Sequence, residues 1–181
     1  NDSYSPVEND MELKHFSIQE DKDDIIPMIK DAMKISEDGF NIIASPWTAA
    51  PWMKDNNNWV GGKLLPKYYD TWALFFSKYL AAYIAEGIDI WGFTVENEPH
   101  GNGNNWESMH YSPKEMTDFV QFHLGPKLEK DGYGNKIILL DKIQEVFSLK
   151  SGDVFKNEDL KEGIKALYGT NYFYRIDAVI K

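Results

Sequence analysis

The stretch "IAEGIDIWGFTV" (Ile84–Val95) carries the clearest signal for the fold of this 181-residue chain. A helical pattern runs into a glycine, and an apolar, β-branched run follows at once. Glycine readily takes the left-handed conformation that closes a helix, so this stretch predicts a helix, a tight turn and a strand. The same order recurs in "SEDGFNIIAS" (Ser36–Ser45) and "EKDGYGNKIILLD" (Glu129–Asp141). We therefore expect three helices that end at glycines, namely Gly39, Gly87 and Gly132.

Four apolar runs are candidate strands: Asn41–Ser45, Ile88–Glu96, Lys136–Asp141 and Arg175–Ile180. They are nearly continuous rather than alternating, which is typical of parallel strands covered on both faces. The fold class that this pattern predicts is α/β, with about four βα units.

The segments between these strands show helical periodicity. Six apolar residues make one long stripe: Trp72, Phe75, Phe76, Tyr79, Leu80 and Tyr83. We interpret this stripe as packing against the sheet rather than a ligand surface, because its period is that of a buried face. A shorter stripe comprises Ile26, Ile29 and Met33. In "YSPKEM", Ser112 and Glu115 predict a capping box with Pro113 at the first helical position, and the helix is expected to break at Gly125-Pro126.

The connections that follow the first two strands are long and rich in Trp, Asn, Gly and Pro: Pro46–Asp70 and Asn97–Ser112. In (β/α) barrels the loops after the strands carry the active site, so this edge is the expected site. A closed barrel at this strand spacing needs on the order of 350 residues. The chain is thus either a fragment of a larger barrel or a small doubly wound sheet. The absence of a G-x-G-x-x-G loop favours the barrel fragment.

Composition narrows the classes of partner. A formal charge of −10 disfavours nucleic acid, anionic membrane surfaces and phosphorylated substrates, and favours a neutral substrate. The sequence contains no cysteine, and the four histidines show no metal-ligand spacing, so neither a metal nor a cofactor is expected. No apolar run reaches the roughly 18 residues of an integral membrane segment. The oligomeric state is not indicated by any pattern.

The second strand ends in "VENEP", where Glu98 directly precedes Pro99. A carboxyl group in the partly desolvated mouth of a barrel has a raised pKa and can act as a general acid, and we expect Glu98 to be that group. Asn97 can both donate to and accept from a sugar hydroxyl. A solvated turn or a local cap is the alternative interpretation. Glu96 is expected to pair with a cation of a neighbouring strand rather than to react.

Four tryptophans lie in the same loops, and flat indoles suit the apolar face of a sugar. Trp47 follows a strand end directly and is the expected ligand contact, together with Trp106. Trp52 and Trp59 are expected to anchor the loops.

Several motifs in register carry a family resemblance: "ASPWTAAPWMK", "TWALFFSKYLAAY", "WGFTVENEP", "NWESMHYSPKEMTDF" and "LGPKL". Together they resemble glycoside hydrolase family 30, the glucosylceramidase family, from Leu13 to the last predicted strand. The resemblance implies a retaining β-glycosidase on a (β/α)8 TIM barrel with an accessory β-domain. It implies glucosylceramide-type or β-1,6-glucan substrates, hence carbohydrate or sphingolipid metabolism, and an extracytoplasmic or secreted location.

Site residues carry over by position. The resemblance makes Glu98 the acid/base, Asn97 the contact to the sugar 2-hydroxyl, Trp47 a wall of the glucose subsite and Trp106 an aromatic at the pocket rim. The family's nucleophile has no counterpart, because it follows a later strand. We therefore expect residues 1–181 to be a fragment of a single catalytic domain, inactive alone and lacking the remaining strands and the β-domain. A non-catalytic carbohydrate-binding relative is the alternative function.

Overall fold

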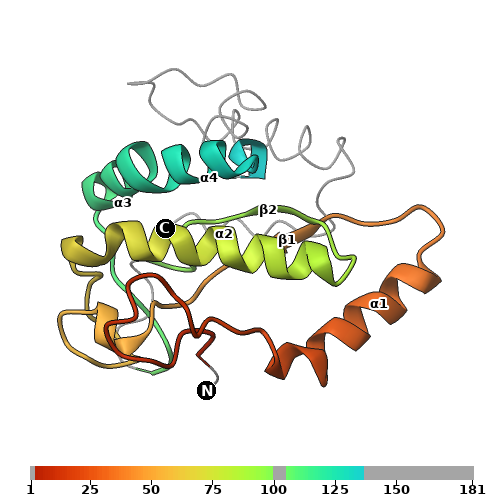
Figure 1. The fold of residues 1–181 in the computed structure, drawn as a ribbon, viewed down its shortest axis with the longest axis horizontal. Helices are drawn as coiled ribbons and strands as arrows, with labels where there is room; N and C mark the ends of the chain where they lie inside the picture. Colours follow the sequence, from red (N-terminus) through yellow and green to blue (C-terminus); the bar gives the residue numbers. More distant parts are fainter. Residues whose placement is uncertain (1–2, 100–104, 137–181) are drawn as a thin grey trace, which may run out of the picture. The chain divides into compact units, whose positions relative to one another are not determined.

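The structure, a computed structural model, describes residues 3–99 and 105–136. Helices and strands alternate along the first part of the chain, as the sequence predicts (Figure 1). The elements are α1 (Ile25–Ile35), β1 (Ile42–Ala44), α2 (Tyr69–Ala85), β2 (Ile90–Phe93), α3 (Pro113–Phe119) and α4 (Gly125–Asp131). Short 3-10 turns occur at Glu20–Lys22, Pro51–Met53, Pro66–Tyr68 and Gly134–Lys136, and a π-helical turn at Val120–Leu124 joins α3 to α4.

The strands β1 and β2 pair in parallel, which confirms the predicted strand direction. Ile42 lies opposite Ile90 and Ala44 opposite Phe93, with an irregularity in the register after Ile42. Both strands are shorter than predicted. The regular ladder ends at Ala44 and Phe93. Beyond these residues the two backbones are joined only by separate hydrogen bonds.

Two further strands were predicted, at Lys136–Asp141 and Arg175–Ile180. Both lie outside the described residues, except that Lys136 belongs to a 3-10 turn. The described part of the chain therefore contains one parallel pair with its helices and does not establish four βα units.

Two of the three glycines predicted to close helices do so. Gly87, at φ +79°, follows α2, and the Ile88 N–H donates to the Tyr83 carbonyl across the turn (3.0 Å). Gly132, at φ +84°, closes α4 in the same way, with the Tyr133 N–H on the Leu128 carbonyl (2.7 Å). Such bonds satisfy carbonyls that the end of a helix leaves free.

Helix α1 differs from the prediction at its C-terminal end. It stops at Ile35, and the extended Ser36 donates from its hydroxyl to the Gly39 carbonyl (3.0 Å). Serine side chains compete in this way with helical hydrogen bonds, so the helix ends before the glycine. The predicted apolar stripe is also only partly covered: Ile26 is buried, whereas Met33 is exposed.

The aromatic stripe of α2 is part of the core, as predicted. Trp72, Phe76, Leu80 and Tyr83 are buried, and the Phe76 ring lies 4.9 Å from that of Phe93 on β2. Packing of this face against β2 fixes the helix beside the strands (Figure 1).

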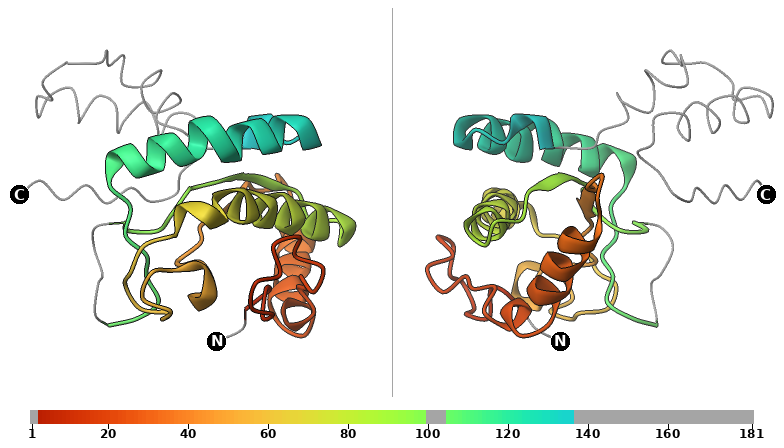
Figure 2. Two further views of the ribbon diagram at one scale, coloured as in Figure 1. Left: turned by 60° about the vertical axis from the view of Figure 1, so that its left-hand side comes forward. Right: turned by 90° about the vertical axis from the view of Figure 1, so that its right-hand side faces the viewer.

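Helices α3 and α4 run on as one rod alongside α2 (Figure 2). The capping box is present: the Glu115 N–H donates to the Ser112 hydroxyl (3.2 Å), and the Ser112 N–H donates to the Glu115 carboxylate (2.7 Å). The predicted break at Gly125-Pro126 is wrong. A π turn absorbs the proline, which lacks an N–H, and the Gly125 N–H reaches back five residues to the Val120 carbonyl.

Candidate functional site

The carboxyl ends of β1 and β2 stay together after the ladder stops. The Thr94 N–H donates to the Ala44 carbonyl (3.0 Å), and the Ser45 and Thr94 hydroxyls are hydrogen-bonded to each other. Further on, the Asn97 N–H donates to the Pro46 carbonyl (2.8 Å). This last bond brings the backbone of Asn97 next to the residue that precedes Trp47.

Trp47 and Trp106 form an exposed aromatic pair. Their ring centroids lie 6.5 Å apart with 56° between the ring planes, and each residue is 47% exposed. Large aromatic side chains with this much exposure offer a surface to a partner or ligand. The structure thus brings together two residues that are 59 positions apart and that the sequence predicts as substrate contacts.

Glu98 lies in the turn after β2 and is exposed. Its φ of +48° places a non-glycine residue in the left-handed region directly before a proline, which is a strained conformation. The turn is held from the other side by His110, whose Nδ1 lies 3.3 Å from the Pro99 carbonyl. The desolvated position expected for Glu98 is therefore not found in the described part of the chain.

The buried carboxyl group of this segment belongs to Glu96, which is 6% exposed. Burial raises the pKa of Glu96 well above its usual value, and the positive charge of Lys54 opposes this change. Neither carboxyl oxygen has a hydrogen-bond partner among the described residues. The cation whose charge acts on Glu96 is Lys54, which comes from a loop rather than from the expected neighbouring strand.

Lys54 is itself 3% exposed and lies where three segments meet. Its ammonium group donates to the Thr48 hydroxyl (2.8 Å), the Trp59 carbonyl (3.1 Å) and the Ser108 carbonyl (2.8 Å). Burial lowers the pKa of Lys54 to about 8, although Glu96 acts in the opposite direction.

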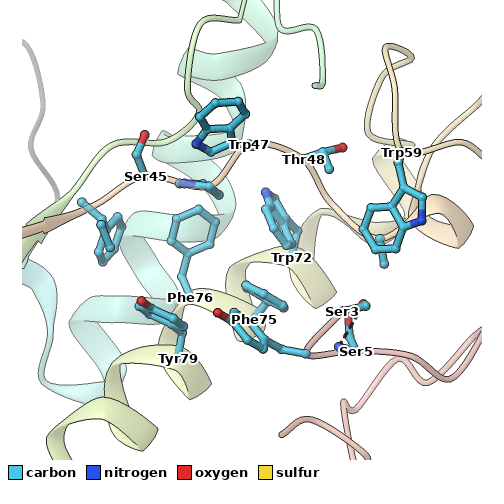
Figure 3. Close-up of a pocket in the computed structure, with 15 residues that line it drawn as sticks. Ser3, Ser5, Ser45, Trp47, Thr48, Trp59, Trp72, Phe75, Phe76 and Tyr79 are labelled. Carbon is cyan, nitrogen blue, oxygen red and sulfur yellow. Dashed lines mark hydrogen bonds between the residues drawn. The ribbon is translucent and has the colours of Figure 1, made fainter. Parts of the chain in front are cut away.

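A cavity of about 360 Å³ lies beside the strand ends, toward α2 (Figure 3). Trp47 and Trp59 contribute to its wall, together with Trp72, Phe75, Phe76 and Tyr79 of α2. Its polar groups include the hydroxyls of Ser3, Ser5, Ser45 and Thr48. The cavity adjoins Trp47 but is not lined by Asn97, Glu98 or Trp106, so the predicted site residues gather around the strand ends rather than inside it.

Trp52 anchors a loop, as predicted. Its indole N–H donates to the Ser5 carbonyl (3.0 Å), and its ring meets Tyr68 edge to face at 5.1 Å. The backbone carbonyl of Trp59 accepts from Lys54 and from the Ser108 N–H (3.1 Å), while its side chain lines the cavity.

Sequence reasoning assigned no role to Lys54. The one sequence signal for a buried Lys54 is that it directly follows the mostly apolar run "AAPWM". In the structure Ala49, Ala50 and Met53 of this run are all buried. A charge inside such a run needs buried partners, but nothing in the sequence names them.

Within residues 3–99 and 105–136, no group of three or more acidic or histidine side chains is gathered in a way that could hold a metal ion. The helices of the same part of the chain are all too short or too polar to cross a bilayer.

One parallel βα pair with a polar, aromatic rim at its strand ends has the arrangement of part of a (β/α) barrel. Residues 1–169 match the family model described as the glycosyl hydrolase family 30 TIM-barrel domain, and the chain belongs to that family. The resemblance in the sequence is thereby confirmed.

Among named relatives, the lysosomal acid glucosylceramidase of Mus musculus is 34% identical over 149 residues, which is 77% of this chain and 29% of the mouse protein. The solved structure of an endo-β1,6-glucanase is 38% identical with a TM-score of 0.65, over 71% of this chain and 30% of that one. The solved structure of SrfJ from Salmonella typhimurium is 28% identical with a TM-score of 0.70, and the match covers 92% of this chain and 37% of SrfJ. The chain thus spans less than a third of the length of these curated relatives, which include a putative glucosylceramidase of Caenorhabditis elegans.

Proposed function

We propose that the whole protein to which this chain belongs is a retaining β-glycosidase that hydrolyses β-glucosides. The observation that carries the proposal is the bond between the Asn97 N–H and the Pro46 carbonyl, because it joins the "NEP" turn to the Trp47 segment in a family 30 domain. Relatives named for glucosylceramide and for β-1,6-glucan support a β-glucoside as the substrate.

In the proposed mechanism Glu98 protonates the leaving oxygen while a second carboxylate attacks the anomeric carbon. Glu98 then removes a proton from the water that releases the sugar. Asn97 holds a hydroxyl next to the reacting carbon, and Trp47 and Trp106 cover a sugar face. In retaining enzymes the two carboxyl groups lie about 5 to 5.5 Å apart.

We place the second carboxylate beyond this chain, at the end of a later barrel strand. The 181-residue chain alone is then inactive, and residues 1–181 are one segment of a single catalytic domain. The short share of the relatives that the chain covers supports this assignment. In this proposal, further strands and loops of the complete domain cover Glu98.

The test uses the whole protein and two aryl β-glucosides. Glu98→Gln is expected to lower kcat/KM at least ~100-fold for a substrate with a poor leaving group, because general acid catalysis contributes about 10² to 10⁴. An activated dinitrophenyl substrate, which leaves without a proton, keeps its first-step rate. The matched control is Glu37→Gln, an exposed glutamate ahead of β1. Near wild-type rates for Glu98→Gln with the poor leaving group contradict the assignment.

Exposure of Glu98 favours one second candidate, a carbohydrate-binding relative without turnover. In that case the whole protein binds β-glucosides through Trp47 and Trp106 yet releases no aglycone, and Glu98→Gln leaves the affinity unchanged.

A further inference from the structure

We propose that Lys54 and Glu96 are positioning residues: together they hold the strand-end segments that carry the candidate site. The role in catalysis rests on the proposed function, whereas the arrangement of the segments does not. Neither residue touches substrate in this proposal. Each acts through the residues that it keeps in place.

The ammonium group of Lys54 joins the two tryptophan-bearing segments. Its acceptor Thr48 directly follows Trp47, and its acceptor Ser108 lies two residues after Trp106. Both bonds are 2.8 Å long, and both start from the same buried nitrogen. One nitrogen atom is therefore bonded to both segments.

The third acceptor extends this connection to the loop that contains Trp59. That loop pairs with the segment after β2: the Gly61 N–H donates to the Ser108 hydroxyl (2.9 Å), and the His110 N–H donates to the Gly62 carbonyl (2.9 Å). His110 in turn contacts the Pro99 carbonyl, next to Glu98. A change at Lys54 is thus transmitted through hydrogen bonds to the turn that presents Glu98.

Glu96 is the buried carboxyl group whose charge acts on Lys54. It lies two residues before Glu98 in the same strand-end segment, and it is buried without a hydrogen-bond partner among the described residues. An isolated buried carboxylate is costly, and the charge of Lys54 compensates part of that cost.

The number of hydrogen bonds that Lys54 makes shows which protonation state of its side chain this arrangement needs. Three acceptors require three N–H groups, which an ammonium group has and a neutral amine lacks. The charges that act on Lys54 come from Glu96 and Asp55, and both favour the ammonium form. Glu96 feels the charge of Lys54 and itself acts on the buried Tyr111 hydroxyl. Loss of the Lys54 proton, near pH 8, leaves one acceptor without a donor.

The first experiment replaces Lys54 in the whole protein with methionine, which is of similar length and uncharged. Lys63→Met is the matched control, because Lys63 lies in the same loop and also bonds to a distant residue, Glu115 of α3 (2.8 Å), but at an exposed position. Hydrogen exchange is followed at 44–49 and 94–98, and kcat and KM are measured on an aryl β-glucoside. We expect Lys54→Met to speed exchange in both segments at least ~10-fold and to lower kcat ~100-fold, with KM changing less, as for misplaced catalytic groups.

Glu96→Gln tests the same unit without removing a hydrogen bond of Lys54. Loss of the negative charge lowers the pKa of Lys54 further, so the alkaline fall in kcat and the onset of faster exchange both move down by about one pH unit. This variant is informative even if Lys54→Met does not fold.

The two proposals fail differently. If the wild-type whole protein shows no glycosidase activity, the proposed function is wrong. The hydrogen-exchange data then still test whether Lys54 and Glu96 hold the strand-end segments in place. If Lys54→Met matches Lys63→Met in exchange and in kcat, or if Glu96→Gln leaves the alkaline onset unchanged, the positioning role is wrong.

Discussion

Replacing Glu115 with glutamine should destabilise the protein in a pH-dependent way. Glu115 is held by Lys63 (2.8 Å) and by the Ser112 N–H (2.7 Å), and these bonds lower its pKa from 4.5 to about 2. At about 1.4 kcal/mol per pH unit, this change corresponds to at most about 3.5 kcal/mol. The side chains of Glu115 and Lys63 are 33% and 49% exposed, so solvent screening reduces the expected contribution to about 1 to 2 kcal/mol.

The sign follows from proton binding. The unfolded chain takes up the Glu115 proton at a higher pH than the folded protein, so the contribution is fully present above pH 4.5 and is lost as the pH falls toward 2. Urea unfolding of wild type and Glu115→Gln, followed by circular dichroism, should show a difference at pH 7 that shrinks by roughly half or more at pH 3. Glu37→Gln is the exposed control and should show none. Equal differences for Glu115→Gln at both pH values would refute the reasoning.

Three further predictions concern two glycines of the backbone and the tryptophans at the rim of the candidate site. Gly125→Ala should cost about 1 to 3 kcal/mol, because a Cβ there meets the Val120 carbonyl oxygen at 2.9 Å; an unchanged Tm would contradict the close approach. Gly87→Ala, at φ +79° in open space, should cost about 1 kcal/mol, read as a lower urea midpoint with an unchanged slope. Trp47→Ala and Trp106→Ala should each raise the KM for a β-glucoside about tenfold without unfolding the protein, and an unchanged KM in both would remove the sugar-stacking role.

Local sequence signals predicted the features of the fold that depend on nearby residues. The capping box of Ser112 and Glu115 and the closing glycines Gly87 and Gly132 are set within one helical turn, so the sequence is sufficient. The predictions for Gly39 and Gly125 were wrong. Helix α1 ends before Gly39, where the Ser36 hydroxyl bonds to the Gly39 carbonyl, and a π turn lets the helix continue through Gly125 and Pro126.

Prediction of the candidate site was less complete, because its geometry depends on contacts between distant segments. The sequence predicted that Trp47 and Trp106 lie on the same edge of the sheet, because both follow strands. It did not predict the distance between their rings. The sequence did not predict that Glu96 is buried and Glu98 exposed, or that Glu98 has a φ of +48°. The partners of Lys54 lie 5, 6 and 54 positions away, and such a set cannot be read from a single sequence.

The most direct test of the central claim is azide rescue of Glu98→Ala in the whole protein with a dinitrophenyl β-glucoside. Without the base at position 98, water attacks the glycosyl-enzyme slowly, whereas azide needs no deprotonation and displaces the enzyme carboxylate as its C–N bond forms. The account predicts faster turnover with azide and a β-glucosyl azide product. A rate independent of azide, or an α-glucosyl azide, would contradict it.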